Sequence, residues 1–488
     1  MKKYLFVLML GFFAACAANA GELLDKARAY DNWYQNWHSS GYGGTSETVF
    51  TDPGLTKVRI LDGIGDSTEW TGTYLEAEAF RYAVEKSPEA LANAKKAYSA
   101  LHAHLLATGR DGFLSRYVGP LKEPYFLGGE AACKNEDRCH VISCPPGLGL
   151  GEAEKCFWIG DTSRDMYIGY FTGASAAYDL IDDPELRSWI RRDVRRVIDR
   201  LLTDGMTIVD VDGKVTGAGH PGPNLRLSWL LIASRILEDE SLQKLYLREF
   251  AKSWGSNIFY SDRYLNLYFE YFAFKLDHDV YYSLMRLEQN PARKKYYRKV
   301  FRNHVYTYTR NSDNPWFDFI AMAGMNEQWP EVIEQSVRVL KAFPQPPNRL
   351  KPVSIEPKPV WKASEGLCEA NYNLAKAGCG LRVLKKDYKV TDLMFFHPVS
   401  REPQQFEGRP VEDFMWQREP NRIADVYQHE FTCGEMKDFP RKQVCGDPAF
   451  GRERVAEESR KGYKVYAGVD YLAPYWMGRY YGFIPAEW

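Results

Sequence analysis

Apolar and polar residues repeat with a helical period along most of the chain between residue 22 and about residue 345. Ala, Leu and aromatic residues return every three or four positions, which places them on one face of an α-helix. Proline stands in the first turn of several of these segments, and the separators are short, so consecutive helices should pack antiparallel. The predicted helices span residues 22–37, 73–85, 88–108, 164–180, 184–203, 223–237, 242–254, 264–289, 291–308 and 329–342.

Few segments have the alternating pattern of a strand, and the composition and periodicity of the chain change after Phe343. Residues 207–213 resemble a small hairpin that turns at Asp212-Gly213. Further on, prolines cluster and the helical period weakens, but the closing stretch YLAPYWMGRYYGFI is too apolar for a disordered tail. We therefore expect an all-α fold with a helical body over 21–345 and an irregular C-terminal segment over 346–488 packed on the same body.

The first twenty residues have the pattern of a secretory signal peptide. Lys2 and Lys3 precede a short apolar stretch, and Ala18-Asn19-Ala20 provides small residues for cleavage. No other segment approaches the length that a membrane-spanning helix needs. We expect an exported protein, periplasmic or extracellular. Lipid attachment at Cys16 is the second alternative, because Phe three residues before that cysteine fits a lipobox poorly.

Eight cysteines remain after Cys16, and an even number in an exported chain indicates disulfide bonds. Two short-range pairs are expected, and four further cysteines surround a Gly/Pro-rich loop that also holds His140. That loop lacks the two-residue cysteine spacing of zinc sites, so we expect disulfides there, with the pairing open. The expected pairs are Cys368 with Cys379 and Cys433 with Cys445, and the open group is Cys133, Cys139, Cys144 and Cys156.

Charge and motif content narrow the functional classes. The chain has 63 basic and 64 acidic residues, so no overall field favours nucleic acid or an anionic membrane. Walker-type, dinucleotide, HExxH and GxSxG motifs are absent, which weighs against nucleotide chemistry, zinc proteolysis and ordinary serine hydrolysis. No cofactor and no metal site are predicted. Aromatic residues make up 15% of the chain and serve either a large core or a groove that stacks sugar rings.

Two similar acidic hexapeptides, GDSTEW from Gly65 and GDTSRD from Gly160, stand directly before helical segments. One interpretation is helix capping. Asp66 with Glu69, and Thr162 with Asp165, have the spacing of capping boxes, and carboxylates in a first turn suit the helix dipole.

The other interpretation is a shared site. Glycoside hydrolysis needs two carboxylates in unlike environments, one protonated and one ionised. Asp66 or Glu69 from one hexapeptide and Asp161 or Asp165 from the other would supply such a pair.

The stretch EWTGTYLEAEAFRYAVEKSPEAL, followed by a long helix and the exit TGRDGFLSRY, resembles a helical hairpin of the six-hairpin (α/α)6-barrel glycosidase-like superfamily. The resemblance rests on a Trp-x-Gly-x-Tyr helix start and a Gly-x-x-x-Arg exit, and it covers about residues 65–237. It implies an (α/α)6-like toroid of antiparallel hairpins, in which loops that lead into inner helices surround a central cavity. That superfamily includes hydrolases, lyases and binding proteins.

Several polar and aromatic residues near predicted helix starts or in loops are candidate substrate contacts. Each has a structural alternative, because caps, core aromatics and buried Arg–Asp pairs give the same patterns. The stretch TRNSDNPWFDF is treated as structural, with Asp313 as the cap of a helix that starts at Pro315. The candidates are Trp70, Tyr74, Arg116, Arg164, Tyr167, His220, Asn224, Arg226, Asp413, Trp416 and Arg418.

These features together predict an exported carbohydrate-active enzyme, foremost a glycoside hydrolase acting on a glycan or oligosaccharide. A polysaccharide lyase is the alternative, with His220 or a Tyr as base and Arg164 or Arg226 against a uronate. The third alternative is a non-enzymatic glycan-binding or envelope protein in which all the acids are caps.

Overall fold

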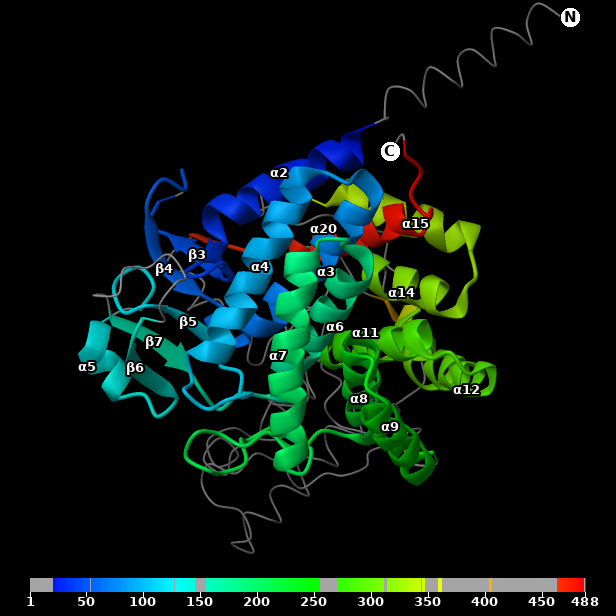
Figure 1. Cartoon of the computed structure of the whole chain (residues 1–488). Coiled ribbons are helices and arrows are strands. Elements are labelled where there is room, and N and C mark those ends of the chain that lie inside the picture. The colour runs from blue at the N-terminus through cyan, green and yellow to red at the C-terminus, as the bar shows by residue number, and fades with distance from the viewer. Residues whose placement is uncertain are drawn as a thin grey trace, which may run out of the picture.

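The computed structural model describes residues 21–346 and 463–488, together with the backbone of two short strands between them. Within these ranges the residues left out are 53, 127, 145–154, 255–270, 311–313, 344 and 487. The described chain is mostly helical with little strand, which confirms the all-α prediction (Figure 1).

The helices differ in length from a single turn to twenty residues. They are α2 (Glu22–Trp37), α3 (Ser67–Glu85), α4 (Pro88–Leu106), α5 (Gly129–Lys134), α6 (Arg164–Leu180), α7 (Pro184–Thr203), α8 (Pro223–Leu237), α9 (Glu240–Ser253), α11 (Tyr271–Leu287), α12 (Pro291–Phe301), α13 (Thr307–Thr309), α14 (Pro315–Met325), α15 (Pro330–Ala342) and α20 (Val469–Tyr480), with a 3₁₀ turn η1 (Ile64–Asp66) and a π-helical turn η3 (Arg302–Tyr306).

The helix starts follow ordinary capping chemistry. Ser87, Asp183 and Asn290 each accept a hydrogen bond from a backbone amide two or three residues on, and a proline follows each of them at the first helical position. Asn314, which precedes Pro315, caps α14 in the same way, so the predicted start is confirmed, although the cap is Asn314 where the prediction had named Asp313.

Six helices of the described chain contact one another in a closed sequence. Helix α3 packs on α6, α6 on α8, α8 on α11, α11 on α14, α14 on α20, and α20 returns to α3. A second helix packs on each member: α4 on α3, α7 on α6, α9 on α8, α12 on α11, α15 on α14 and α2 on α20.

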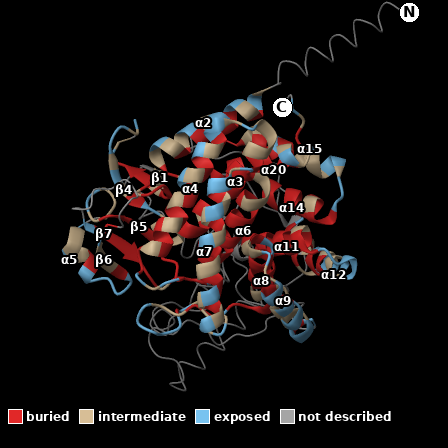
Figure 2. Ribbon diagram, in the orientation of Figure 1, coloured by how far each residue is buried: buried red, intermediate tan, exposed pale blue. Residues whose placement is uncertain are grey.

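The burial pattern matches this arrangement (Figure 2). Helices such as α3, α6, α8, α14 and α20 are buried over most of their surface, whereas α4, α7, α9, α12 and α15 alternate buried and exposed residues. The second group has the amphipathic pattern of helices with one face in solvent. Helix α14 instead reads PWFDFIAMAGM and is apolar nearly all round, as a helix enclosed by others must be.

Glycines let α3 and α6 approach closely. A Cβ added at Gly72 would lie 1.9 Å from the carbonyl oxygen of Gly169, and one at Gly173 would lie 2.3 Å from that of Gly72. Backbone therefore packs against backbone at this crossing, and the Trp-x-Gly-x-Tyr pattern has a packing role.

Two small sheets lie at one side of the helical body, at the left in Figure 1. One sheet has the order β10–β3–β4 and another β5–β7–β6, both antiparallel. The strands are β1 (Ser39–Ser40), β2 (Gly44–Thr45), β3 (Glu47–Phe50), β4 (Val58–Asp62), β5 (Tyr117–Pro120), β6 (Cys139–Ser143), β7 (Lys155–Ile159), β8 (Pro359–Trp361), β9 (Pro403–Gln405) and β10 (Tyr463–Val465).

The predicted hairpin near residue 210 is reduced to an isolated bridge between Val209 and Val215, with Gly213 at positive φ in its turn. The end of the chain also differs from the expectation of irregular structure. Helix α20 is regular, its Tyr471 and Leu472 are fully buried, and β10 pairs with β3, so the predicted docking onto the body is confirmed for this part.

Two disulfides tie the β6–β7 region. Cys133 bonds Cys139, and Cys144 bonds Cys156, which resolves the pairing that the sequence left open. The other four predicted disulfide cysteines, at 368, 379, 433 and 445, lie outside the described residues. Among the helices that are described, none is long and apolar enough to cross a bilayer.

Candidate functional site

The two acidic hexapeptides lie side by side, joined by one side chain. The Arg116 guanidinium donates to the carbonyl of Gly65 at 2.8 Å, to the carbonyl of Asp161 at 2.9 Å and to the Ser163 hydroxyl at 2.8 Å. It also lies 3.5 Å from the Asp66 carboxylate. The segments that begin at Gly65 and Gly160 are therefore neighbours, as the shared-site hypothesis requires. Arg116 joins them through hydrogen bonds to protein groups, and we call this connection the Arg116 clamp.

Neither capping box forms. Asp66 stands at the N-cap of α3 and Ser163 at the N-cap of α6, and neither side chain makes a capping hydrogen bond. The Thr162 hydroxyl donates instead to the carbonyl of Leu114 at 2.7 Å. The capping interpretation of both hexapeptides was wrong, because the Arg116 clamp and neighbouring loops take up these polar groups.

Asp161 is held in an uncommon backbone conformation, with φ at 50°. Its carboxylate accepts from the amide of Gly217 at 2.8 Å, and its own amide donates to Asp210 at 2.7 Å. A non-glycine residue in this region costs about 1–3 kcal/mol unless its surroundings fix it, and these bonds do so. The loop after β7 is thereby fixed, with the Asp161 side chain still partly exposed.

Glu69 is sealed in the core. Its side chain is fully buried and forms an ion pair with Lys275 of α11, whose ammonium also lies 2.7 Å from Asp279. The second carboxyl oxygen of Glu69 has no hydrogen-bond partner and faces Gly169 of α6. A group enclosed in this way cannot touch a glycan, so the structure argues against the predicted catalytic role of Glu69.

The protonation of this cluster follows from its charges. Burial raises the pKa of Glu69 to about 8, against the opposing attraction of Lys275. Burial likewise raises the pKa of Asp279. Burial alone would lower the pKa of Lys275, but Asp279 and Glu69 outweigh it and raise that pKa. One ammonium thus faces two carboxyl groups, and at neutral pH the favourable state keeps a proton on one of them.

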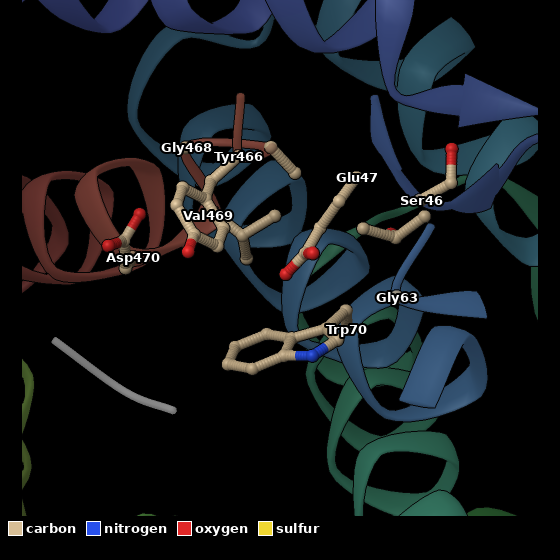
Figure 3. Close-up of a pocket in the computed structure, with 10 residues that line it drawn as sticks. Ser46, Glu47, Gly63, Trp70, Tyr466, Gly468, Val469 and Asp470 are labelled. Atoms are coloured by element: carbon tan, nitrogen blue, oxygen red, sulfur yellow. The ribbon is translucent and has the colours of Figure 1, made fainter. Parts of the chain in front are cut away.

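A cavity opens beside this cluster, at the first turns of α3 and α20 (Figure 3). The cavity is lined by Trp70 of α3, Glu47 of β3 and Asp470 of α20, together with Tyr466. The Glu47 side chain reaches toward the Trp70 indole, and Asp470 lies farther along, beyond Tyr466 and Val469 (Figure 3). The remaining described lining residues are Thr45, Ser46, Gly63, Ala467, Gly468 and Val469.

Two glycines make this geometry available. Gly63 has φ at 66°, which favours glycine, and a Cβ there would lie 2.9 Å from the Glu47 carboxyl carbon, so a larger residue would push that side chain from its present position. Gly468 has φ at 76° just before α20, where a Cβ would lie 2.2 Å from the Tyr30 ring. The chain turns at both points, beside the Glu47 carboxyl group in one case and just before Asp470 in the other.

The indole that lines the cavity also contacts the buried cluster. The Lys275 ammonium lies 5.4 Å from the centre of the Trp70 ring, within the range of a cation–π interaction. Of the predicted substrate contacts, Trp70 is the one that the described cavity includes.

The other predicted contacts lie elsewhere. Tyr74 is buried against Tyr34 and donates to Asp31, and Tyr167 is buried against Trp229. Both rings belong to the core, which argues against direct substrate contact.

The remaining polar candidates are committed to protein groups or lie outside the described residues. Arg164 is exposed and donates to the carbonyl of His220, which is itself exposed. Asn224 is buried and donates to Asp277, and Arg226 pairs with Glu249 at 2.6 Å.

Asp165, a predicted catalytic residue, is half-buried at the start of α6, and its charge helps to raise the pKa of Glu69. Asp413, Trp416 and Arg418 lie outside the described residues.

Sequence reasoning missed Glu47 and Asp470. Glu47 lies in a four-residue strand too short for a periodic signal, and its position depends on the return of β10 from more than 400 residues away. Asp470 did have a local signal, since it stands in the first turn of a helix after a glycine.

Among the described residues, no three His, Cys, Asp or Glu side chains gather in a way that could hold a metal ion. Comparisons of the chain with protein-family models, with curated proteins and with solved structures found no match.

Proposed function

We propose that this protein is an exported glycoside hydrolase whose catalytic centre is the cavity lined by Trp70, Glu47 and Asp470. The observation that carries the proposal is the combination in one cavity of an indole and two carboxylates from different elements. Sugar rings stack their C–H faces on aromatic planes, and hydrolysis of a glycosidic bond needs two carboxyl groups in unlike surroundings.

The architecture supports the same proposal. A closed sequence of six helices with a second helix outside each is the arrangement of an (α/α)6 toroid. The cavity lies at the N-terminal ends of α3 and α20, which are neighbours in that sequence. We therefore extend the all-α description to an (α/α)6 toroid with its active site at this end.

The two carboxyl groups have different surroundings. Asp470 is 4% exposed and stands in the first turn of α20, where the helix dipole favours an ionised carboxylate. Glu47 is half-buried on a strand, β3, and its carboxyl group lies beside Gly63 at the start of η1. We assign Asp470 as the base or nucleophile and Glu47 as the general acid, with Trp70 as the platform for the sugar.

Asp66 and Asp161 form the rival pair. Both carboxylates are partly exposed and lie in segments that Arg116 holds together. Asp161 accepts from the Gly217 amide and Asp66 pairs with Arg116, so we assign both to fixing the loops that flank the helix starts. Their substitution separates the two assignments.

The test is an activity screen of the mature protein on a panel of neutral, amino-sugar and acidic glycans. Hydrolysis releases new reducing ends without new ultraviolet absorbance, whereas a lyase produces an unsaturated product that absorbs in the near ultraviolet. A substrate cleaved with reducing ends alone supports the proposal. Absorbing products would favour the lyase, and binding without cleavage of any glycan would favour a binding protein.

A further inference from the structure

Helix α12 carries an unusual concentration of positive charge on a chain whose net charge is −1. Its sequence PARKKYYRKVF has five basic residues and no acidic residue. Arg293 pairs with Glu288, and Arg298 donates to the carbonyl of Gly324. The exposed Lys295 and Lys299 have no ion-pair partner among the described residues. They stand four positions apart, so both project on one side of the helix.

An exposed aromatic pair lies beside these lysines. Trp254, at the end of α9, is 60% exposed, the most of any large apolar side chain in the described chain. Its ring stacks on Tyr296 of α12, with centroids 6.0 Å apart and planes 25° apart. The Tyr296 hydroxyl donates to the carbonyl of Trp254, and Phe250 packs edge-on against Tyr296. The indole thus contacts Tyr296, and more than half of its side chain stays exposed.

Tyr296 and Lys299 are three positions apart and therefore neighbours on the helix surface. Trp254, Tyr296, Lys295 and Lys299 thus form one continuous patch, which we call the α9–α12 platform. It lies on the outer helices at the lower right of Figure 1, away from the cavity at the starts of α3 and α20.

We propose that the α9–α12 platform binds an acidic polysaccharide. Its lysines meet anionic groups along the polymer, and the exposed indole of Trp254 stacks on a sugar ring. Lysine ammonium groups are compact point charges on flexible stems, which suits an anionic chain of variable shape. The site does not depend on the hydrolase assignment, since it uses none of the cavity residues.

A membrane surface fits the same patch less well. A helix that lies in a bilayer interface needs an apolar face of its own. The apolar residues of α12, Tyr297, Val300 and Phe301, are buried against the protein. The exposed groups are the Trp254 indole and the ammonium groups of Lys295 and Lys299. An isolated indole between charged groups suits a sugar ring better than the acyl chains of a lipid layer.

The experiment measures binding of the full mature protein to immobilised polygalacturonate at increasing salt. We expect Lys295→Gln/Lys299→Gln to lower the affinity at least about fivefold at low salt and to flatten the dependence of log K on log salt by roughly two charges. Trp254→Ala should lower the affinity several-fold without changing that slope, because stacking is not screened by salt.

The matched control is Lys57→Gln/Arg59→Gln, which removes the same charge from exposed residues at the start of β4, on the opposite side of the molecule (Figure 1). It should bind as the unchanged protein does. Equal loss in both double variants, equal binding to neutral dextran, or binding to phosphatidylglycerol vesicles or duplex DNA but not to polygalacturonate would overturn the proposal. Unchanged thermal unfolding confirms that each variant is folded.

Discussion

The Lys275 ammonium lies 5.4 Å from the centre of the Trp70 ring and forms ion pairs with Glu69 and Asp279. The indole that lines the cavity therefore rests on a fully buried charge cluster contributed by α3 and α11. This contact connects the stability of the helical body to the shape of the candidate site.

Replacing Lys275 by an uncharged residue should be far more damaging than replacing the Glu69 carboxyl group by an amide. Lys275→Met leaves two buried carboxyl groups without their cation, and breaking a buried pair in this way costs about 3–5 kcal/mol of unfolding free energy. Glu69→Gln replaces a carboxyl group whose pKa is already raised to about 8 and leaves the Lys275–Asp279 pair intact, so its cost should stay below about 1.5 kcal/mol. Urea unfolding of the two variants at pH 7 measures both, and equal losses would contradict this view of the cluster.

Stability should fall as the pH rises from about 6.5 to 8. Burial raises the pKa of Glu69 and of Glu76 to about 8, so both stay protonated in the folded protein while the unfolded chain loses these protons near pH 4.5. Their stabilisation is complete below about pH 4.5 and is lost as the pH rises to 8. Burial lowers the pKa of His104 and His278 to about 3, which gives an opposing slope, but only below about pH 6.5.

The measurement is urea unfolding at pH 6.5 and 8. We expect the unfolding free energy to fall by at least about 1 kcal/mol between them, because each pKa unit corresponds to about 1.4 kcal/mol. The Glu69→Gln/Glu76→Gln variant should lose most of this slope. A slope that the double variant retains would show that other groups cause it.

The close approach of α3 and α6 predicts a sharp difference between two glycines. Gly72→Ala places a methyl group 1.9 Å from the Gly169 carbonyl oxygen and should destabilise the protein by about 3 kcal/mol or prevent folding. Gly65→Ala is the control. It meets no atom within 4 Å, its φ is not positive, and the change should stay within about 0.5 kcal/mol. Thermal unfolding of both variants tests the crossing, and tolerance of Gly72→Ala would contradict it.

Peptide mapping without reduction should recover Cys133 linked to Cys139 and Cys144 linked to Cys156. The sequence further predicts Cys368 linked to Cys379 and Cys433 linked to Cys445, with no free thiol in the mature protein. Each short loop closed in this way contributes about 2–4 kcal/mol. A different pairing of the first four cysteines, or bound zinc in that loop, would contradict the structure of the β6–β7 region.

Long periodic segments were predictable, and sites that depend on distant pairing were not. The bounds of α2, α6, α7 and α8 agree with the sequence pattern to the residue, and a proline marks the start of α7 and of α8. Helix α20 was not recognised as regular, since Pro474 and the aromatic run around it obscure the period.

The candidate site shows the same division. The adjacency of the hexapeptides was inferred from where loops meet in a toroid, and Trp70 was identified because it is the aromatic residue that ends the first of them. The burial of Glu69 was not foreseeable, because its partner Lys275 lies about two hundred residues away in the chain and no local pattern pairs them. Glu47 reaches the cavity only through pairing of β3 with β10, which a single sequence does not reveal.

The most direct test of the central claim compares isosteric variants on whichever glycan the protein cleaves. Glu47→Gln and Asp470→Asn should each lower the rate of reducing-end formation about 10²–10⁴-fold while the protein stays folded, because each removes a group that moves a proton or attacks the sugar. Asp66→Asn and Asp161→Asn should keep the rate within about threefold, since the loops they fix retain the Arg116 clamp. Full activity of the Glu47 and Asp470 variants, with loss in the Asp66 or Asp161 variant, would contradict the account and move the catalytic centre to the two hexapeptides.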